Sequence, residues 1–256
     1  MIVCYARGDG LGHLTRMRAY LHTVHPGEPA TILTAWPGDI SRYKPAEVVV
    51  DAFPAGLDGE VRVPPGVPAV HLARLLRWEA YRPLISGSLI SGPAVSGSVC
   101  SGPVRFDRTW VCEPVSEPHL AFLHEISGQV APLELTDPPA PAQDARGDWL
   151  IVHSGPPAET MELVAYARES AACEGLDPRL VLVSPAAPPG LPPGVTHTDV
   201  RPAWPLFATA GRIVSAAGFN VVRQAAPYRH KHRMMPFPRR FDDQFTRAAR
   251  ARSGTT

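Results

Sequence analysis

Cysteine is scarce in this 256-residue sequence, which has four cysteines, at positions 4, 100, 112 and 173. Because none of them forms a C-x-x-C pair, the sequence favours reduced cysteines over a disulfide framework or a zinc site. Long apolar runs are missing as well, since none reaches the roughly 18 residues needed to span a bilayer. The chain opens directly into an apolar segment, so we expect no signal peptide. These absences predict a cytoplasmic protein.

An excess of one charge is also missing, since 25 Lys and Arg residues face 24 Asp and Glu residues, for a net charge of +1. Such a balance does not indicate a polyanionic partner. No nucleic-acid motif and no interleaving of aromatic with basic residues is present, so we expect no nucleic acid among the partners. No D-x-D acidic triplet occurs, and we therefore expect no metal site.

Proline, in contrast, is abundant: the 30 prolines are more than twice the average share of about 5%. They gather in connections such as "SPAAPPGLPPG", between segments that alternate in strand-like and helix-like character. This alternation predicts an α/β class with mostly parallel sheets. The proline-rich, polar stretch 136–148 has no apolar period and predicts a linker between an N-terminal domain, 1–135, and a C-terminal domain, 149–256. Two such Rossmann-like domains are expected to bind ligands beyond the carboxyl ends of their strands.

The strand-like segments fall on both sides of this linker. They are residues 1–6, 30–35, 46–53, 67–76, 108–115 and 129–135 in the first half, and 148–154, 179–184, 212–218 and the residues before Pro236 in the second. Apolar residues at helical spacing predict helices after the first strand and after residue 154, marked by Leu14, Met17, Leu21 and Val24, and by Leu163, Val164, Ala167 and Ala171. A final helix is expected over 241–252, with Phe241, Phe245, Ala248 and Ala249 on one face.

Residues 85–104 repeat every five residues as ISGSL, ISGPA, VSGSV and CSGPV. This low-complexity stretch is too rich in glycine for a helix and predicts a flexible surface insertion. A mobile flap over a binding site is the alternative.

The stretch "ARGDGLGHLTR" places Gly8, Gly10 and Gly12 on the turn between the first strand and the first helix, followed by His13. Glycine lets a backbone approach a ligand closely, and a helix N-terminus favours an anion. A tight turn without a ligand is the alternative. In the second half, Gly218 ends a strand just before a helix that begins near Phe219 or Asn220, which predicts a second anion site.

After Pro236-Phe237-Pro238, a loop presents Asp243 and Gln244 at the start of the final helix. A carboxylate beside an amide supplies both acceptors and donors for sugar hydroxyls.

Two patches together resemble the GT-B glycosyltransferases. They are G-x-G-H at positions 10–13, and S-x-x-G at 215–218 followed by a helix and by P-F-x(6)-Q at 236–244. The chain is most similar to glycosyltransferase family 28, the group with the N-acetylglucosaminyltransferase that forms lipid II. The resemblance implies two Rossmann-like domains facing a central cleft, and metal-independent, inverting transfer of a hexosyl or N-acetylhexosaminyl group. The donor would be a nucleotide-sugar, with UDP as the expected nucleotide, the acceptor is unknown, and no further cofactor is implied.

The resemblance also implies roles for individual residues. His13 is the candidate general base, because histidine titrates near neutral pH, with Asp9 second; the alternative is that His13 caps its helix. Arg7 and Arg239 would stabilise the diphosphate. The donor-binding residues would be Gly10, Gly12, Ser154, Gly155, Gly218, Asn220, Gln224, Asp243 and Gln244.

The sequence departs from the family pattern at Gln224, where the family has a glutamate that holds both ribose hydroxyls. A neutral acceptor makes a weaker hydrogen bond than a carboxylate. The family also ends with a helix that crosses back to the first domain, whereas this sequence stops just after the 241–252 helix. These departures keep two alternatives open: a non-catalytic protein that binds a nucleotide-sugar or a partner, and a nucleotide-sugar 2-epimerase.

The C-terminal region is locally basic, with nine Lys and Arg against two Asp over 223–252. A solvated surface is one interpretation. Contact with anionic lipid headgroups, where each basic residue contributes about 1 kcal/mol, is the other, and it would place the protein peripherally at a membrane.

Overall fold

The computed structural model describes residues 1–7, 11–90 and 104–254, which form two compact units. Unit 1 comprises Met1–Pro138 together with Arg240–Asp243, and unit 2 comprises Pro139–Arg239 together with Gln244–Thr256. The break after Pro138 falls within the stretch 136–148 that the sequence suggested as a linker. The short segment Arg240–Asp243 differs from expectation, because it groups with unit 1 although it follows the second sheet in the chain.

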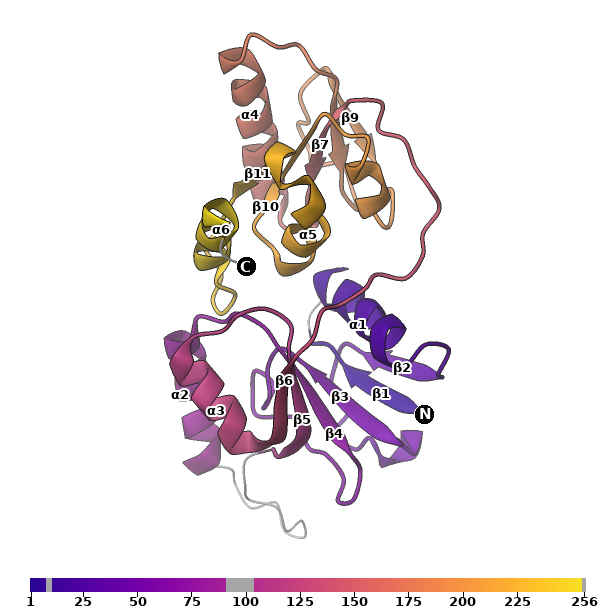
Figure 1. The fold of residues 1–256 in the computed structure, drawn as a ribbon, viewed down its shortest axis with the longest axis vertical. Helices are drawn as coiled ribbons and strands as arrows, with labels where there is room; N and C mark the ends of the chain where they lie inside the picture. Colours follow the sequence, from indigo (N-terminus) through magenta and orange to yellow (C-terminus); the bar gives the residue numbers. More distant parts are fainter. Residues whose placement is uncertain (8–10, 91–103, 255–256) are drawn as a thin grey trace. The chain divides into compact units, whose positions relative to one another are not determined.

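The described residues of unit 1 contain a six-stranded sheet in the order β2-β1-β3-β4-β5-β6, and neighbouring strands are all parallel (Figure 1). The central strands are almost fully buried, as expected of a parallel sheet covered on both faces. All six strands were predicted from the sequence. Their bounds are β1 Ile2–Tyr5, β2 Ala30–Leu33, β3 Glu47–Asp51, β4 Ala69–Ala73, β5 Phe106–Val111 and β6 Ser127–Pro132.

Helix α1 (Leu11–Val24) follows β1 and buries a different face from the one predicted. Met17 is buried as expected, but the remaining members of the expected stripe, Leu14, Leu21 and Val24, are only partly buried. The buried face also contains Arg16 and Tyr20. An arginine is tolerated there because a buried carboxylate from β3 pairs with it, and hydrophobic periodicity cannot reveal such a partner.

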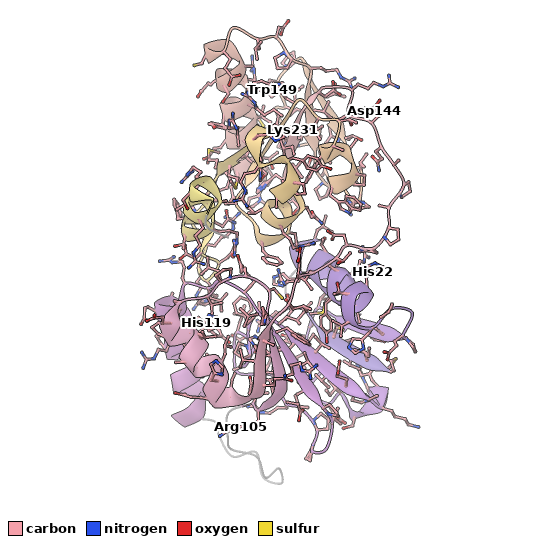
Figure 2. The ribbon with its side chains drawn as sticks, viewed as in Figure 1. His22, Arg105, His119, Asp144, Trp149 and Lys231 are labelled. Carbon is pink, nitrogen blue, oxygen red and sulfur yellow. The ribbon has the colours of Figure 1, made fainter. Side chains whose placement is uncertain are left out.

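Helix α2 (Trp78–Ile90) continues into the first copy of the five-residue repeat, so the prediction that residues 85–104 are not helical is wrong for 85–90. The helix is anchored by Trp78, Tyr81 and Ile85, which are buried in one cluster. Helix α3 (Glu117–Ile126) packs nearby: its His119, labelled in Figure 2, stacks on Trp78 with ring centroids 4.5 Å apart and an interplanar angle of 7°. Residues 91–103 of the repeat lie outside the described residues.

The described residues of unit 2 contain a five-stranded parallel sheet in the order β11-β10-β7-β8-β9. Four of its strands were predicted. Strand β9 was missed, because the sequence Val-Thr-His-Thr offers one apolar residue and no alternation. The bounds are β7 Trp149–Val152, β8 Leu180–Val183, β9 Val195–Thr198, β10 Arg212–Ala216 and β11 His232–Met235.

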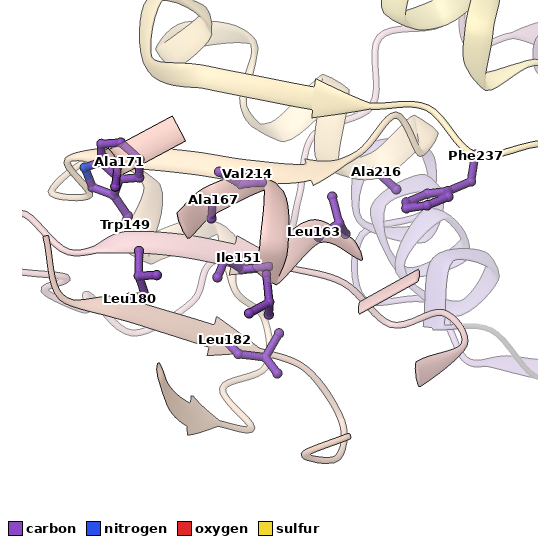
Figure 3. Packing of buried hydrophobic residues seen from close by; sticks show 11 residues of the cluster. Trp149, Ile151, Leu163, Ala167, Ala171, Leu180, Leu182, Val214, Ala216 and Phe237 are labelled. Carbon is purple, nitrogen blue, oxygen red and sulfur yellow. The ribbon is translucent and has the colours of Figure 1, made fainter. Parts of the chain in front are cut away.

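Alternate residues of each strand point to opposite faces of this sheet. Ile151, Leu182 and Val214 pack against helix α4 (Pro157–Cys173), whose predicted apolar stripe is fully buried (Figure 3). Leu150 and Val181 belong to the cluster on the other face. That cluster includes residues of the short helix η2 (Trp204–Phe207) and is flanked by residues of α5 (Phe219–Gln224) and η3 (Ala226–Lys231).

The last helix, α6 (Gln244–Ser253), starts three residues later than predicted. Its buried residues are Gln244, Arg247, Ala248 and Ala251, so the predicted apolar face is wrong except for Ala248. Phe245 is 55% exposed. Phe241 is buried, but in a cluster of unit 1 rather than on the helix, and this tertiary contact pulls residues 241–243 out of helical conformation.

Candidate functional site

In each sheet the strand order reverses at one pair of neighbouring strands, which is the topological switch point. The expected site residues follow the strands of these pairs. In unit 1 the chain winds outward from the β1/β3 pair, and in unit 2 from the β7/β10 pair. Ligands of open parallel sheets bind beyond the carboxyl ends of the strands at such a switch point. His13 lies shortly after β1, whereas Ser154 and Gly155 follow β7 and Gly218 follows β10.

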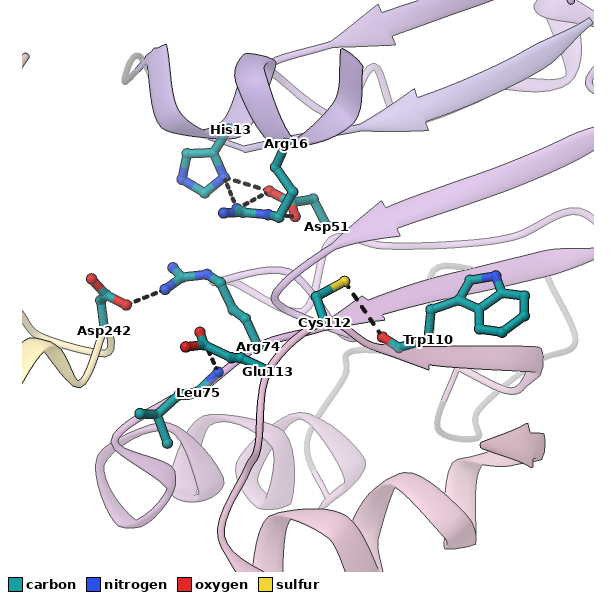
Figure 4. Close-up of polar contacts among 9 residues, drawn as sticks. All are labelled: His13, Arg16, Asp51, Arg74, Leu75, Trp110, Cys112, Glu113 and Asp242. Carbon is teal, nitrogen blue, oxygen red and sulfur yellow. Dashed lines mark hydrogen bonds and ion pairs between the residues drawn. The ribbon is translucent and has the colours of Figure 1, made fainter. Parts of the chain in front are cut away.

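In unit 1 the switch point holds a three-residue ionic cluster (Figure 4). His13 Nδ1 lies 2.6 Å from Oδ2 of Asp51, the last residue of β3. Arg16, one helical turn after His13, binds the same carboxylate through two hydrogen bonds. Its Nε donates to Oδ1 and its Nη2 donates to Oδ2, each at 2.5 Å. Such a bidentate pair fixes the carboxylate in one orientation.

Burial and charge act against each other on Asp51, whose side chain is fully buried. Burial alone would raise the pKa of Asp51, but the charge of Arg16 and the hydrogen bond from His13 outweigh it and hold that pKa well below its usual range. An ionised carboxylate accepts hydrogen bonds only, so His13 donates from Nδ1. In the neutral imidazole held in this way, Nε2 is the acceptor atom, and the His13 side chain remains 19% exposed.

Asp51 and Arg16 were not among the residues singled out from the sequence. Asp51 carried a signal, because a carboxylate directly after the apolar run "VVV" lies near the carboxyl end of a predicted strand. Arg16 carried one as well, because it lies three positions after His13 and so on the same side of the helix. Neither signal identifies the partner without the fold.

The other residues of unit 1 that we expected at the site are Arg7, Asp9, Gly10 and Gly12. Asp9 and Gly10 lie outside the described residues, and so does Gly8. Gly12 is exposed in the first turn of α1. Arg7 is bound to two carboxylates, Glu60 and Asp58, each at 2.7 Å, so its charge is already balanced within the unit.

In unit 2, Ser154 and Gly155 are exposed in the turn between β7 and α4. A Cβ at Gly155 would clash with Nε2 of His153 and come within 3.1 Å of Glu159 Oε2, so a larger residue would require the His153 side chain to move. Burial lowers the pKa of His153 although its hydrogen bond with Glu159, at 3.1 Å, opposes that shift. His153 thus lies against the turn at Gly155 as a neutral side chain.

Arg239 pairs with both oxygens of Glu159, in the first turn of α4. Burial would raise the pKa of Glu159, but Arg239 and His153 lower it, so the glutamate stays ionised. The sequence placed Arg239 near a diphosphate, and the pair with Glu159 means that this cation is shared with a carboxylate of its own unit.

Helix α5 begins at Phe219, within the predicted range, and Gly218 is its N-cap. A Cβ at Gly218 would meet Val221 Cγ1 alone, at 3.9 Å, so the described residues leave open space beside the glycine. Asn220 and Gln224 are half-buried on the same helix, which has six residues.

Gln244, in contrast, is 4% exposed, and its Oε1 accepts a hydrogen bond of 3.1 Å from the amide of Phe237. It therefore joins the end of the second sheet to the start of α6. Asp243 is half-buried, and it belongs to the segment that groups with unit 1.

Several cations of the basic run 223–252 are engaged within unit 2. Lys231 donates to the carbonyl oxygens of Ala208 and Ala210, and Arg229 donates to that of Ala251. The buried Arg247 donates to the carbonyl oxygen of Ala217 at 2.9 Å. The run is therefore partly a structural feature of unit 2.

Among residues 1–7, 11–90 and 104–254, no group of three or more His, Cys, Asp and Glu side chains is arranged to hold a metal ion. None of the helices formed by the described residues combines the length and apolar character that crossing a bilayer requires.

No protein-family model matches the sequence, and no curated protein matches it. Solved structures do match over nearly the whole chain. Two parallel-sheet α/β units of this kind form the GT-B fold, which these neighbours share. At these identities the likeness establishes the fold alone.

Three neighbours illustrate the match. The spinosyn rhamnosyltransferase SpnG aligns with 99% of this chain and 84% of its own, with a TM-score of 0.55 and 15% identity. UGT2 of Phytolacca americana, solved with UDP-2-fluoro-glucose and pterostilbene, aligns over the same shares with a TM-score of 0.56 and 12% identity. The glycotransferase of kitacinnamycin does so with a TM-score of 0.53 and 16% identity.

Proposed function

We propose that this protein is a glycosyltransferase that moves a sugar from a nucleoside-diphosphate donor to a hydroxyl-bearing acceptor. The observation that carries the proposal is the His13–Asp51 pair at the switch point of the first sheet. The fold supports it, because the neighbours named above are glycosyltransferases, and one structure of SpnG holds thymidine diphosphate.

The chemistry requires a base for the acceptor and stabilisation of the leaving group. Nε2 of His13 takes the proton of the acceptor hydroxyl, and the acceptor oxygen forms a bond to the anomeric carbon of the sugar. The bond between that carbon and the diphosphate oxygen breaks, and the nucleoside diphosphate leaves with the electron pair. Asp51 stabilises the imidazolium that forms, because its carboxylate faces Nδ1. Attack opposite to the leaving group inverts the anomeric carbon.

The donor is assigned to the turns at the switch point of unit 2. The amides near Ser154, Gly155 and Gly218 would hold the diphosphate without a metal ion. Asn220 and Gln224 would lie on the nucleoside side. Asp243 would accept hydrogen bonds from sugar hydroxyls, whereas Gln244 acts by holding its backbone in place, because its oxygen is engaged by Phe237.

The first experiment is a panel of UDP-, dTDP- and GDP-sugars, with binding measured by calorimetry and turnover by released nucleotide, with and without Mg²⁺. We expect saturable binding of one nucleotide and slow, metal-independent release. His13→Ala should abolish release and leave the Kd of the nucleotide unchanged. Exposed His230→Ala is the matched control and should leave both unchanged. Release that survives His13→Ala would overturn the assignment of the base, and no binding of any nucleotide would overturn the function.

A non-catalytic nucleotide-binding protein is the second candidate. Arg7 and Arg239 are both paired with carboxylates, and a cation already neutralised stabilises a developing diphosphate charge less. This candidate predicts binding without nucleotide release when a crude cell extract is supplied as acceptor. Release that depends on the extract and on His13 would exclude it.

A further inference from the structure

The segment Arg240–Asp243 is fastened to unit 1 by three kinds of contact. Phe241 is 6% exposed and packs between the rings of Phe53 and Tyr81, at centroid distances of 5.8 and 5.6 Å. The amide of Arg77 donates to the carbonyl oxygen of Phe241 at 2.7 Å, and Leu76 forms an isolated antiparallel bridge with Asp242. The third contact is an ion pair.

Arg74 supplies that ion pair from the carboxyl edge of the first sheet. It is the residue directly after β4, its side chain is 8% exposed, and its Nη1 donates to Oδ1 of Asp242 (Figure 4). The guanidinium also lies over the ring of Phe53, 5.8 Å from its centroid. Phe53 therefore contacts both Arg74 and Phe241, so the arginine and the segment are held in one arrangement.

Asp242 and Asp243 follow each other in the chain, and Arg74 pairs with the first of them. The peptide link holds the two Cα atoms about 3.8 Å apart, so an anchored Asp242 limits where the carboxylate of Asp243 can lie.

We propose that Arg74 is a positioning residue for recognition of the donor sugar: by pairing with Asp242, it fixes the carboxylate of Asp243 that accepts hydrogen bonds from sugar hydroxyls. This inference rests on the proposed function and assigns a role within it to a residue of the N-terminal half. It predicts that Arg74 contributes to binding of the sugar and not to binding of the nucleotide.

The test compares a nucleotide-sugar with its free nucleotide. UDP-glucose and UDP are titrated into wild type, Arg74→Gln and Arg74→Lys by calorimetry, or dTDP-glucose and dTDP if wild type prefers them. For Arg74→Gln we expect Kd and KM of the nucleotide-sugar to rise about tenfold, the loss typical of one charge-assisted hydrogen bond, with the Kd of the free nucleotide unchanged. We expect kcat to fall less than KM rises. Arg74→Lys should recover part of the loss because it keeps the charge.

Asp242→Asn is the second variant and should reproduce the effect if Arg74→Gln fails to fold. The charge swap Arg74→Asp with Asp242→Arg should restore discrimination towards the nucleotide-sugar. Arg42→Gln, an exposed arginine of unit 1, is the matched control. If the variants weaken nucleotide and nucleotide-sugar equally, or neither, while wild type transfers sugar, Arg74 has no positioning role. If wild type binds no nucleotide, the proposed function fails and the inference with it.

Discussion

His13 Nδ1 lies 2.6 Å from Asp51 Oδ2, although the two residues are 38 positions apart and belong to a helix and a strand. The contact exists because α1 follows β1 and Asp51 ends β3, the strand paired with β1 in parallel. The sheet register therefore sets the orientation of the imidazole, and Arg16 fixes the carboxylate that holds it.

We expect Asp51→Asn to lower kcat by about 100-fold or more, because an amide no longer stabilises the imidazolium and can favour the wrong tautomer. The Kd of the nucleotide should be unchanged, since Asp51 belongs to unit 1 and the nucleotide is assigned to unit 2. Steady-state turnover and calorimetry on the same preparation provide the measurement. Asp39→Asn, an exposed aspartate of the same unit, is the control. Equal turnover by Asp51→Asn and wild type would remove Asp51 from the mechanism.

Arg16→Leu should lower the free energy of unfolding by about 3–5 kcal/mol, because it leaves the buried carboxylate of Asp51 without its guanidinium partner. Replacing both residues, as Arg16→Leu with Asp51→Leu, should recover much of that loss, since apolar pairs are often no worse than buried ion pairs. Urea unfolding at pH 7.5, followed by circular dichroism, measures both variants. A double variant as unstable as the single one would show that the loss comes from packing and not from the unpaired charge.

Stability should fall as pH decreases from 6.5 towards 5, because buried histidines must stay neutral. Burial lowers the pKa of His71 to about 4 and that of His119 to about 3, whereas the unfolded chain has ordinary histidine pKa values. The unfolded state therefore binds more protons below pH 6.5, and each histidine withdraws about 2 kcal/mol of stability between pH 6.5 and 5. Above pH 6.5 the stabilisation is fully present.

His119→Phe tests this effect, since phenylalanine keeps a ring against Trp78 but cannot be protonated. The variant should lose less stability than wild type when urea unfolding is repeated at pH 7.5 and 5. Exposed His230→Phe is the control and should keep the wild-type pH dependence. A His119→Phe variant with the pH dependence of wild type would contradict the assignment.

Two glycine substitutions should differ in their effects on stability and on nucleotide binding. Gly155→Ala should lower the free energy of unfolding by about 1–3 kcal/mol, because its Cβ clashes with His153. Gly218→Ala should leave stability within about 0.5 kcal/mol, since φ is −71° and its Cβ meets Val221 alone, at 3.9 Å. Gly218→Ala should nevertheless weaken nucleotide binding, because the added methyl group occupies space assigned to the diphosphate. Thermal melts measure the stability of both variants, and calorimetry measures their nucleotide affinity. Unchanged nucleotide affinity in Gly218→Ala would contradict the assigned site.

The sequence predicted the parts of the fold that depend on local apolar patterning. Strands buried on both faces appear as short apolar runs such as "VVV", and four apolar residues of α4 recur at helical spacing. Strand β9 was missed because its pairing with β8, rather than its composition, makes it a strand. The start of α6 was misplaced because Phe241 packs against Phe53 and Tyr81, which are far away in sequence.

The candidate site residues depend on the sequence in two ways. The strand–turn–helix pattern indicated His13 and Gly218, whereas Ser154 was implied by the resemblance to the glycosyltransferase family. Asp51 and Arg74 lie near the carboxyl ends of the predicted strands 46–53 and 67–76, but their partners lie on other elements, and no spacing in the sequence indicates a pairing between elements.

Because Phe241 belongs to the aromatic cluster around Phe53 and Tyr81, unit 1 consists of two stretches of sequence, and Pro139–Arg239 of unit 2 lies between them along the chain. During synthesis, all strands of the first sheet are translated before Phe241, the last aromatic residue of this cluster in the sequence. A fragment ending at Pro138 would lack the ring of Phe241 beside Phe53 and Tyr81, and the carboxylate of Asp242 that pairs with Arg74. Completion of the core of unit 1 is therefore a late, long-range step in folding.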